Sequence, residues 1–224
     1  IFMDTRLTPM HELLQYAEER NIAIGAFEFW SFEVARAALA AAEDLSLPLI
    51  LQCGTMEIAR MGGLEGTVET LLRAAKGTKA PVALHLDHAT SEDYCRAAVD
   101  AGFSSVMFDG SALPYAQNTA STRRICEYAH RAGVSCEGEL GRLRGEEGAI
   151  SNPESAQTDP HEALRFYAET GVDALAPSIG TAHGVYTFEP HLNIPRLRQI
   201  HALLPKVPLV LHGGSGTPMN QVQE

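Results

Sequence analysis

The sequence lacks several features that would place it in a common class of protein. No run approaches the ~20 consecutive apolar residues of a membrane-spanning helix. There is no surplus of positive charge, since the formal net charge is −11 at pH 7, which argues against nucleic acids or anionic membranes as partners. The N-terminus has no basic segment followed by an apolar one, as a secretory signal would. We therefore expect a cytoplasmic protein that binds neither nucleic acid nor membrane.

Paired cysteine motifs are also missing. The four cysteines, at positions 53, 95, 126 and 136, form no CxxC pair, so the sequence offers no zinc-ribbon or thioredoxin-like signal. We predict reduced and mostly buried thiols, as in a cytosolic protein. A disulfide is the less favoured alternative.

Short apolar runs alternate with longer amphipathic stretches along the whole chain. The helices are expected to begin at capping residues, namely Ser31, Ser91 and the Asp159-Pro160 pair. No low-complexity tract or composition break divides the 224 residues, so we expect a single domain over 1–224. The expected strands cover residues 22–29, 47–53, 82–87, 104–109, 134–140, 174–179 and 208–212, and the expected helices cover about 31–45, 64–76, 91–101, 116–131, 159–170 and 195–204.

Seven consecutive strand–helix units indicate a parallel sheet. A doubly wound sheet would place its ligand at one switch point between two neighbouring loops. Polar residues here follow five different strands, which favours a (β/α)8 TIM barrel. A barrel of this kind needs an eighth strand, so we expect that the last strand and the C-terminal helices are missing from this sequence.

Three histidines come just after apolar strand-like runs. They are His88 in VALHLDH, His183 in ALAPSIGTAH and His212 in LVLHGGSG. Because the carboxyl ends of parallel strands lie at one edge of the sheet, these imidazoles can converge on one ion. Three protein ligands with an open position is the arrangement of catalytic zinc. The alternative for each is a surface or loop histidine without a ligand.

Carboxylates follow the same strands. Asp87 precedes His88, Asp109 ends the fourth expected strand, and Glu137 and Glu139 share a face of the fifth. Such groups can bind a metal or transfer protons, although Asp87 could instead cap the next helix. The pair at 146 and 147 belongs to a glycine-punctuated loop, which can be a mobile lid or a solvated loop tip. The glycines at 213, 214 and 216 offer successive N–H groups for a phosphate, or simply a tight turn.

Five segments in this order and spacing resemble the class II, metal-dependent ketose-bisphosphate aldolases, especially the shorter tagatose-bisphosphate branch. The segments are HLDHA, MFDGS, EGELGRLRGEEG, TGVDALAPSIGTAHGVY and LVLHGGSGTP. The resemblance extends from GAF at 25–27 to the end of the chain. It implies a lyase that cleaves a phosphorylated ketose, of the tagatose- or fructose-1,6-bisphosphate type, to dihydroxyacetone phosphate and an aldehyde.

The resemblance also implies a role for each matching residue. Zinc would be bound by His88, His183 and His212, and Glu139 would approach it in some states. A second divalent metal would be bound at Asp109 and Glu146. Asp87 would be the acid/base acting on the C4 hydroxyl of the sugar, and Glu147 would exchange protons at the donor carbon. The donor phosphate and a monovalent cation, Na⁺ or K⁺, would lie at Gly184, Gly213 and Ser215.

The implied chemistry has a physical basis. Retro-aldol cleavage develops negative charge on the donor oxygens, and a zinc ion can stabilise that charge as a Lewis acid without a Schiff base. Neutral imidazole ligands leave the ion fully dicationic. The resemblance further implies a homodimer or homotetramer, a small sugar phosphate as the partner molecule, and a place in carbohydrate metabolism such as glycolysis.

Two positions depart from the family pattern. Glu28 stands where the family usually has asparagine, and Gly54 stands where it usually has a serine that helps to bind the donor phosphate. These departures motivate an alternative, a class II aldolase-like enzyme with a donor that is not a bisphosphate. A metal-dependent hydrolase on the same barrel is a further alternative, because zinc with three histidines can activate water.

Overall fold

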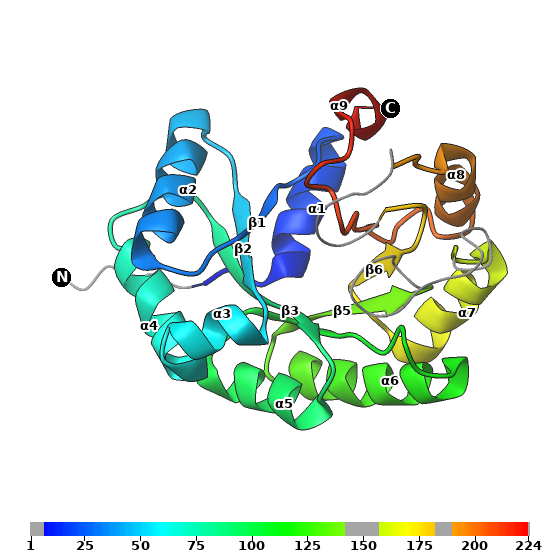
Figure 1. The fold of residues 1–224 in the computed structure, drawn as a ribbon, viewed down its shortest axis with the longest axis horizontal. Coiled ribbons are helices and arrows are strands. Elements are labelled where there is room, and N and C mark those ends of the chain that lie inside the picture. The colour runs from blue at the N-terminus through cyan, green and yellow to red at the C-terminus, as the bar shows by residue number, and fades with distance from the viewer. Residues whose placement is uncertain (1–6, 142–156, 182–189, 224) are drawn as a thin grey trace. The chain divides into compact units, whose positions relative to one another are not determined.

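A computed structural model describes residues 7–141, 157–181 and 190–223 (Figure 1). The chain forms two compact units. The first unit comprises Ile1–Phe108 and Ile125–Cys136, and the second comprises Asp109–Arg124 and Glu137–Glu224. Two elements, α6 (Tyr115–Arg131) and β5 (Ser135–Leu140), have residues in both. The expectation of one domain over 1–224 stays a prediction.

The first unit is a series of strand–helix pairs on a parallel sheet. Its strands β1 to β4 pair in chain order, with Ala26 beside Ile50 and Leu49 beside Val82. Helices α2 and α4 pack against each other. The elements are α1 (Met10–Arg20), β1 (Ala26–Glu28), α2 (Phe32–Leu45), β2 (Leu49–Cys53), α3 (Thr55–Arg60), α4 (Gly63–Ala74), β3 (Val82–Ala89), α5 (Glu92–Ala101) and β4 (Ser105–Phe108).

The second unit continues the same pattern. Residues Glu137–Leu140 of β5 pair in parallel with β6, and helices α7 and α8 pack against each other. The elements are α7 (Pro160–Thr170), β6 (Ala174–Pro177), α8 (Ile194–Leu203) and the short α9 (Met219–Val222).

The capping signals placed the helix starts correctly. The Ser31 hydroxyl accepts a hydrogen bond from the Val34 N–H at 3.4 Å, and Ser91 accepts one from Tyr94 at 3.3 Å. The Asp159 carboxylate accepts from two N–H groups at the start of α7. These bonds satisfy donors that a helix start leaves without intrahelical partners. The additional helix α3 was not predicted, because its six residues are too short for a periodic pattern.

The strand order β1-β2-β3-β4-β5-β6 follows the order of the chain. A doubly wound sheet reverses its order at a switch point, so this alternative does not apply. Sequential parallel βα units are the topology of the (β/α)8 class. Every residue of β4, β5 and β6 is buried, as expected for parallel strands that are covered on both faces.

The seventh predicted strand, residues 208–212, is reduced to one parallel bridge between Leu175 and Leu209. Two backbone hydrogen bonds form it, from the Leu175 N–H to Pro208 O and from the Val210 N–H to Leu175 O. Pro208 has no N–H to donate, and a turn begins at His212. Regular pairing is therefore limited to the centre of the segment.

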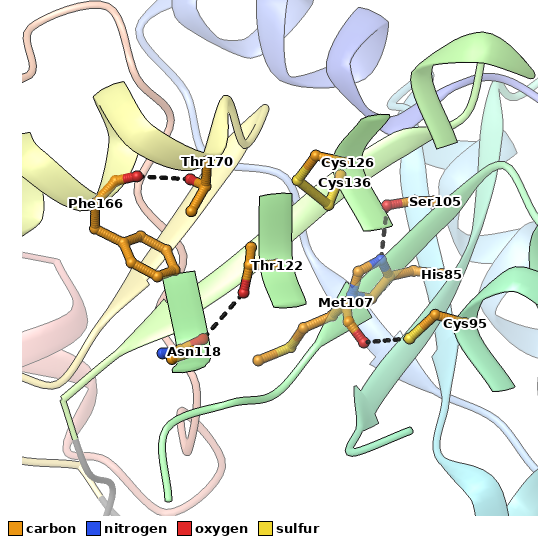
Figure 2. Close-up of a disulfide and its surroundings, with 10 residues drawn as sticks. All are labelled: His85, Cys95, Ser105, Met107, Asn118, Thr122, Cys126, Cys136, Phe166 and Thr170. Carbon is orange, nitrogen blue, oxygen red and sulfur yellow. Dashed lines mark hydrogen bonds between the residues drawn. A yellow bond between two sulfur atoms is a disulfide. The ribbon is translucent and has the colours of Figure 1, made fainter. Parts of the chain in front are cut away.

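The prediction that all four cysteines are reduced was wrong for two of them. Cys126 on α6 and Cys136 on β5 form a disulfide, with their Cα atoms 5.2 Å apart (Figure 2). This spacing lies within the usual range for a disulfide, and it arises because α6 leads through a short turn directly into β5. Cys53 and Cys95 are free and buried, as predicted.

Among the described residues, no helix combines the length and the apolar character that crossing a membrane requires. The cytoplasmic location stays a prediction.

Candidate active site

The carboxyl end of β3 has an irregular backbone. The register between β3 and β4 shifts between Leu86 and Ala89, and His88 adopts a left-handed φ of 45°. Bulges redirect side chains near functional sites, and a positive φ is uncommon for a residue other than glycine. The irregularity places two consecutive polar side chains together, with His88 Nε2 3.8 Å from Asp87 Oδ1. We interpret it as a feature that serves the site.

Asp87 is buried and is contacted by the neighbouring strand. The Gln52 amide Nε2 on β2 donates a hydrogen bond to Asp87 Oδ2 at 2.8 Å. Only 7% of Asp87 is exposed and Gln52 is half-buried, so this bond is partly shielded from water. Sequence reasoning missed Gln52. The signal that could have identified it is its position as the next-to-last residue of a strand that neighbours β3.

Two residues before Asp87, His85 has a partner of its own. His85 Nδ1 lies 2.7 Å from the Ser105 hydroxyl, within the buried part of the sheet (Figure 2). This contact orients the ring between β3 and β4. His85 and Asp87 therefore have different partners, although alternation along the strand puts them on one face.

Two more carboxylates lie near the ends of β1 and β2. Partial burial raises the pKa of Glu28, and the neighbouring carboxylates of Glu57 and Asp87 raise it further, while His88 lowers it. The pKa of the buried Cys53 thiol is raised by its burial and then by the same three carboxylates. A Cβ added to Gly54 would lie 3.1 Å from Glu57 Oε2. The absence of a side chain at Gly54 therefore leaves room for the Glu57 carboxylate.

In the second unit, β5 presents Glu137 and Glu139 on one face, and both are buried with 2% exposed. Gly138 between them lies on the opposite face. A Cβ there would come within 2.9–3.1 Å of Val172, Phe166 and Thr122 side-chain atoms. The close helix packing on that face accounts for the glycine, and it fixes both glutamates toward the other face.

Glu137 contacts His212, which is one of the predicted zinc ligands. Its Oε1 lies 2.7 Å from His212 Nε2, and both side chains are buried. A carboxylate accepts hydrogen bonds, so it selects the imidazole tautomer with hydrogen on Nε2 and leaves the Nδ1 lone pair for another partner. A carboxylate behind a metal-binding histidine is the usual support of such a ligand. Glu137 belongs to the candidate site, although it was not predicted as one of its specific residues.

We expect Glu137→Gln to weaken zinc binding without unfolding the protein. The amide keeps the size of the side chain but removes the charge that makes the imidazole a better ligand, so the dissociation constant should rise about 10–100-fold. Competition with a zinc chelator measures this change. An unchanged zinc affinity would show that the Glu137–His212 contact is structural only.

Asp109, predicted to bind a second metal with Glu146, and Glu139, predicted to approach the zinc, both lie in a buried region of the second unit. Asp109 follows β4, is 6% exposed, and accepts a hydrogen bond from the Ser111 N–H at 3.0 Å. The backbone of Glu139 is fixed by the Asn118 amide, which donates to the Glu139 carbonyl at 2.9 Å. The Asp109 carboxylate is thus fixed by a backbone N–H group, and the strand that carries Glu139 is fixed by the Asn118 amide.

The glycine-rich segment after the last bridge forms a tight turn. Gly213 has a φ of 67°, which favours glycine, and Thr217 donates from its N–H to Gly214 O and from its hydroxyl to Gly213 O. Ser215 is exposed at this turn. The turn is compatible with the predicted phosphate contacts, because glycines let a ligand approach the backbone closely. The predicted residues His183, Gly184, Glu146 and Glu147 lie outside the described residues.

Comparisons with known proteins identify the family to which the chain is similar. The family model for fructose-bisphosphate aldolase class-II matches residues 8–224. The chain is 40% identical to a fructose-bisphosphate aldolase of Geobacillus stearothermophilus over 97% of this chain and 76% of the relative. It is 43% identical to a 6-phospho-5-dehydro-2-deoxy-D-gluconate aldolase of Shouchella clausii, over 96% of this chain and 73% of the relative.

A solved structure shows the same fold. The crystal structure of the YdjI aldolase from Escherichia coli K12 matches with a TM-score of 0.84 and 31% identity, over 97% of this chain and 76% of that one. The parallel βα fold, with polar residues at its strand ends, is thus that of an aldolase, a lyase that acts on carbon–carbon bonds. The chain belongs to the class II fructose-bisphosphate aldolase family.

Class II aldolases are generally metal-dependent, and each unit contributes an imidazole of the kind that zinc binds. His88 lies at an irregular strand end, and the tautomer of His212 is set by Glu137. Neutral imidazoles are good zinc ligands. Each imidazole has a carboxylate beside it within its own unit, Asp87 near His88 and Glu137 at His212, as is usual for histidines that bind zinc.

Proposed function

We propose that the protein is a zinc-dependent class II aldolase that reversibly cleaves a phosphorylated ketose to dihydroxyacetone phosphate and an aldehyde. The observation that carries the proposal is the irregular end of β3, where His88 and the buried Asp87 lie side by side. Membership of the family supports it, and so does the Glu137 carboxylate behind His212. The proposed zinc ligands are His88, His183 and His212.

The chain's own residues would move the protons. Asp87 accepts the proton of the C4 hydroxyl as the oxygen becomes a carbonyl, and the C3–C4 bond breaks with its electron pair left on C3. Glu147 then delivers a proton to C3 of the donor. Zinc, when bound, supplies Lewis-acid stabilisation of the charge that develops on the donor oxygens. Glu139 is proposed to approach the metal in some states of the reaction.

Further parts of the proposal concern other ligands and the assembly. Asp109 and Glu146 would bind a second divalent metal. Gly184, Gly213 and Ser215 would contact the donor phosphate and a monovalent cation, Na⁺ or K⁺. We propose a closed (β/α)8 barrel for the enzyme, which works as a homodimer or homotetramer on small sugar phosphates in carbohydrate metabolism such as glycolysis.

The proposal is tested by metal removal and a cleavage assay. The purified protein is treated with a chelator, and cleavage of fructose- and tagatose-1,6-bisphosphate is followed by the release of dihydroxyacetone phosphate. Activity should disappear with the metal and return when zinc is added back. Cleavage that persists in metal-free protein would contradict the proposed mechanism.

A second candidate is an aldolase whose donor lacks the phosphate. It is favoured by the three carboxylates, Glu28, Glu57 and Asp87, that act together on Cys53 at the ends of β1 to β3. Like charges repel a phosphate group more strongly in a partly buried site than in water. Gly54 offers no side chain to donate a hydrogen bond to a phosphate at this position.

We expect Glu28→Asn to shift the donor preference toward phosphate. Removing one negative charge should raise the ratio of kcat/KM for phosphorylated over unphosphorylated donors on the order of tenfold, which corresponds to ~1.4 kcal/mol. The measurement is aldol addition with dihydroxyacetone phosphate and with dihydroxyacetone as donors. The control is Glu69→Gln on the exposed face of α4, which changes the net charge equally. An unchanged ratio would exclude Glu28 as a determinant of the donor.

A further inference from the structure

We propose that Gln52 is a positioning residue that orients the Asp87 carboxylate for proton transfer. This inference rests on the proposed function, in which Asp87 is the acid/base. Its basis is the 2.8 Å hydrogen bond from Gln52 Nε2 to Asp87 Oδ2, formed between side chains that are 35 residues apart in the chain.

The register of the sheet explains how the two side chains meet. Gln52 on β2 pairs with His85 on β3, and Asp87 lies two residues further along β3 on the same face as His85. The glutamine side chain is long enough to reach forward along the strand to this position. Shorter side chains at 52 would leave the amide too far from the carboxylate.

The hydrogen bond distinguishes the two oxygens of Asp87. Oδ2 accepts from Gln52, whereas Oδ1 lies 3.8 Å from His88 Nε2. The hydrogen bond from Gln52 therefore fixes one side of the carboxylate, while the other oxygen faces the imidazole of His88. A carboxylate that must remove a proton needs its free lone pairs at a defined place, because efficient transfer requires hydrogen-bond distance to the substrate hydroxyl.

The chemical nature of Gln52 suits this task. An arginine or lysine at this place would pair with Asp87 and make it a weaker base, whereas an amide orients the carboxylate and leaves its charge intact. The surrounding charge makes such a contact useful, since Glu28 and Glu57 lie near Asp87 and like charges push the carboxylate away. The Gln52 bond opposes that displacement.

The test compares two reactions of the same enzyme. Asp87 acts on the C4 hydroxyl, which dihydroxyacetone phosphate lacks, so the exchange of a donor C–H proton with solvent needs the metal but not an oriented Asp87. For Gln52→Met, which has a similar shape without the amide, kcat for ketose cleavage should fall about tenfold or more. KM, the zinc content and the rate of solvent deuterium exchange into dihydroxyacetone phosphate should remain near the wild-type values.

Two further variants make the result interpretable. Gln15→Met on the exposed face of α1 is the matched control and should change neither reaction. Gln52→Asn keeps the amide but shortens its reach, and it should show the same selective loss of cleavage. If Gln52→Met does not fold, as judged by circular dichroism, Gln52→Asn provides the test.

Three outcomes would overturn the inference. Cleavage at the wild-type rate would show that the hydrogen bond does not matter. Equal losses of cleavage and exchange, or loss of zinc, would assign Gln52 a structural role in the whole site. A wild-type protein with neither cleavage nor exchange after zinc addition would instead reject the proposed function itself, and the inference with it.

Discussion

Replacing His212 with alanine should abolish both stoichiometric zinc binding and ketose cleavage. The imidazole is buried, and Glu137 fixes its tautomer so that Nδ1 is available as a ligand. Losing one of three proposed ligands removes Lewis-acid stabilisation worth several kcal/mol, and each 1.36 kcal/mol is a factor of ten in rate. We therefore expect kcat/KM to fall ~10³-fold or more. Zinc content by mass spectrometry and the cleavage assay measure the two effects.

A matched control separates the loss of the ligand from the loss of a histidine in general. His201 lies exposed on α8, and His201→Ala should retain both zinc and activity. The His212 variant also leaves the buried Glu137 without its imidazole partner, which lowers stability, so a melting curve in the absence of metal must accompany the assay. Full zinc content with full activity in folded His212→Ala would show that the assignment of this ligand is wrong.

Replacing Asp87 with asparagine should slow ketose cleavage but not the exchange of protons on the donor product. The amide has nearly the shape of the carboxylate but cannot accept the C4 hydroxyl proton. Loss of a general base typically lowers the rate 10²–10⁴-fold, so we expect kcat for cleavage to fall ~10²-fold or more. Deuterium exchange into dihydroxyacetone phosphate should persist, because that substrate has no C4 hydroxyl. The two rates are measured by dihydroxyacetone phosphate release and by NMR.

A second aspartate in the same part of the chain provides a control for the removal of a carboxylate. Asp93, in the first turn of α5, is a nearby carboxylate that the proposed mechanism does not use, and Asp93→Asn should leave both rates unchanged. If Asp87→Asn cleaves the ketose at the wild-type rate, another group accepts the proton, and the proposed role of Asp87 fails. Parallel loss of exchange and zinc would point to damage of the metal site instead.

Local features of the molecule could be predicted from the sequence because they depend on neighbours in the chain. Ser31, Ser91 and Asp159 cap their helices through N–H groups two or three residues away. Most of the buried strands, such as β2 and β3, have apolar runs that identify them without knowledge of the fold. The exceptions are short elements such as α3, and the segment at 208–212, where a proline and a turn limit the pairing.

Contacts between distant segments could not be predicted in this way. The sequence alone placed Glu137 on one face of the fifth strand and His212 at the end of the seventh, but it did not show that they touch across 75 positions. The Gln52–Asp87 bond depends on the register of β2 against β3. The Cys126–Cys136 disulfide was missed because cysteine spacing carries no information on how α6 turns into β5.

The sequence by itself determined that this chain is a series of parallel strand–helix units of the class II aldolase family, because periodicity, caps and motifs are written in consecutive residues. Only the tertiary structure decided which polar side chains support one another: Gln52 behind Asp87 and Glu137 behind His212. The physical reason is that a hydrogen bond forms only at short range, up to about 3.5 Å between the heavy atoms. Those distances are set by the order and register of strands that lie far apart in the chain, which single-chain patterns do not encode.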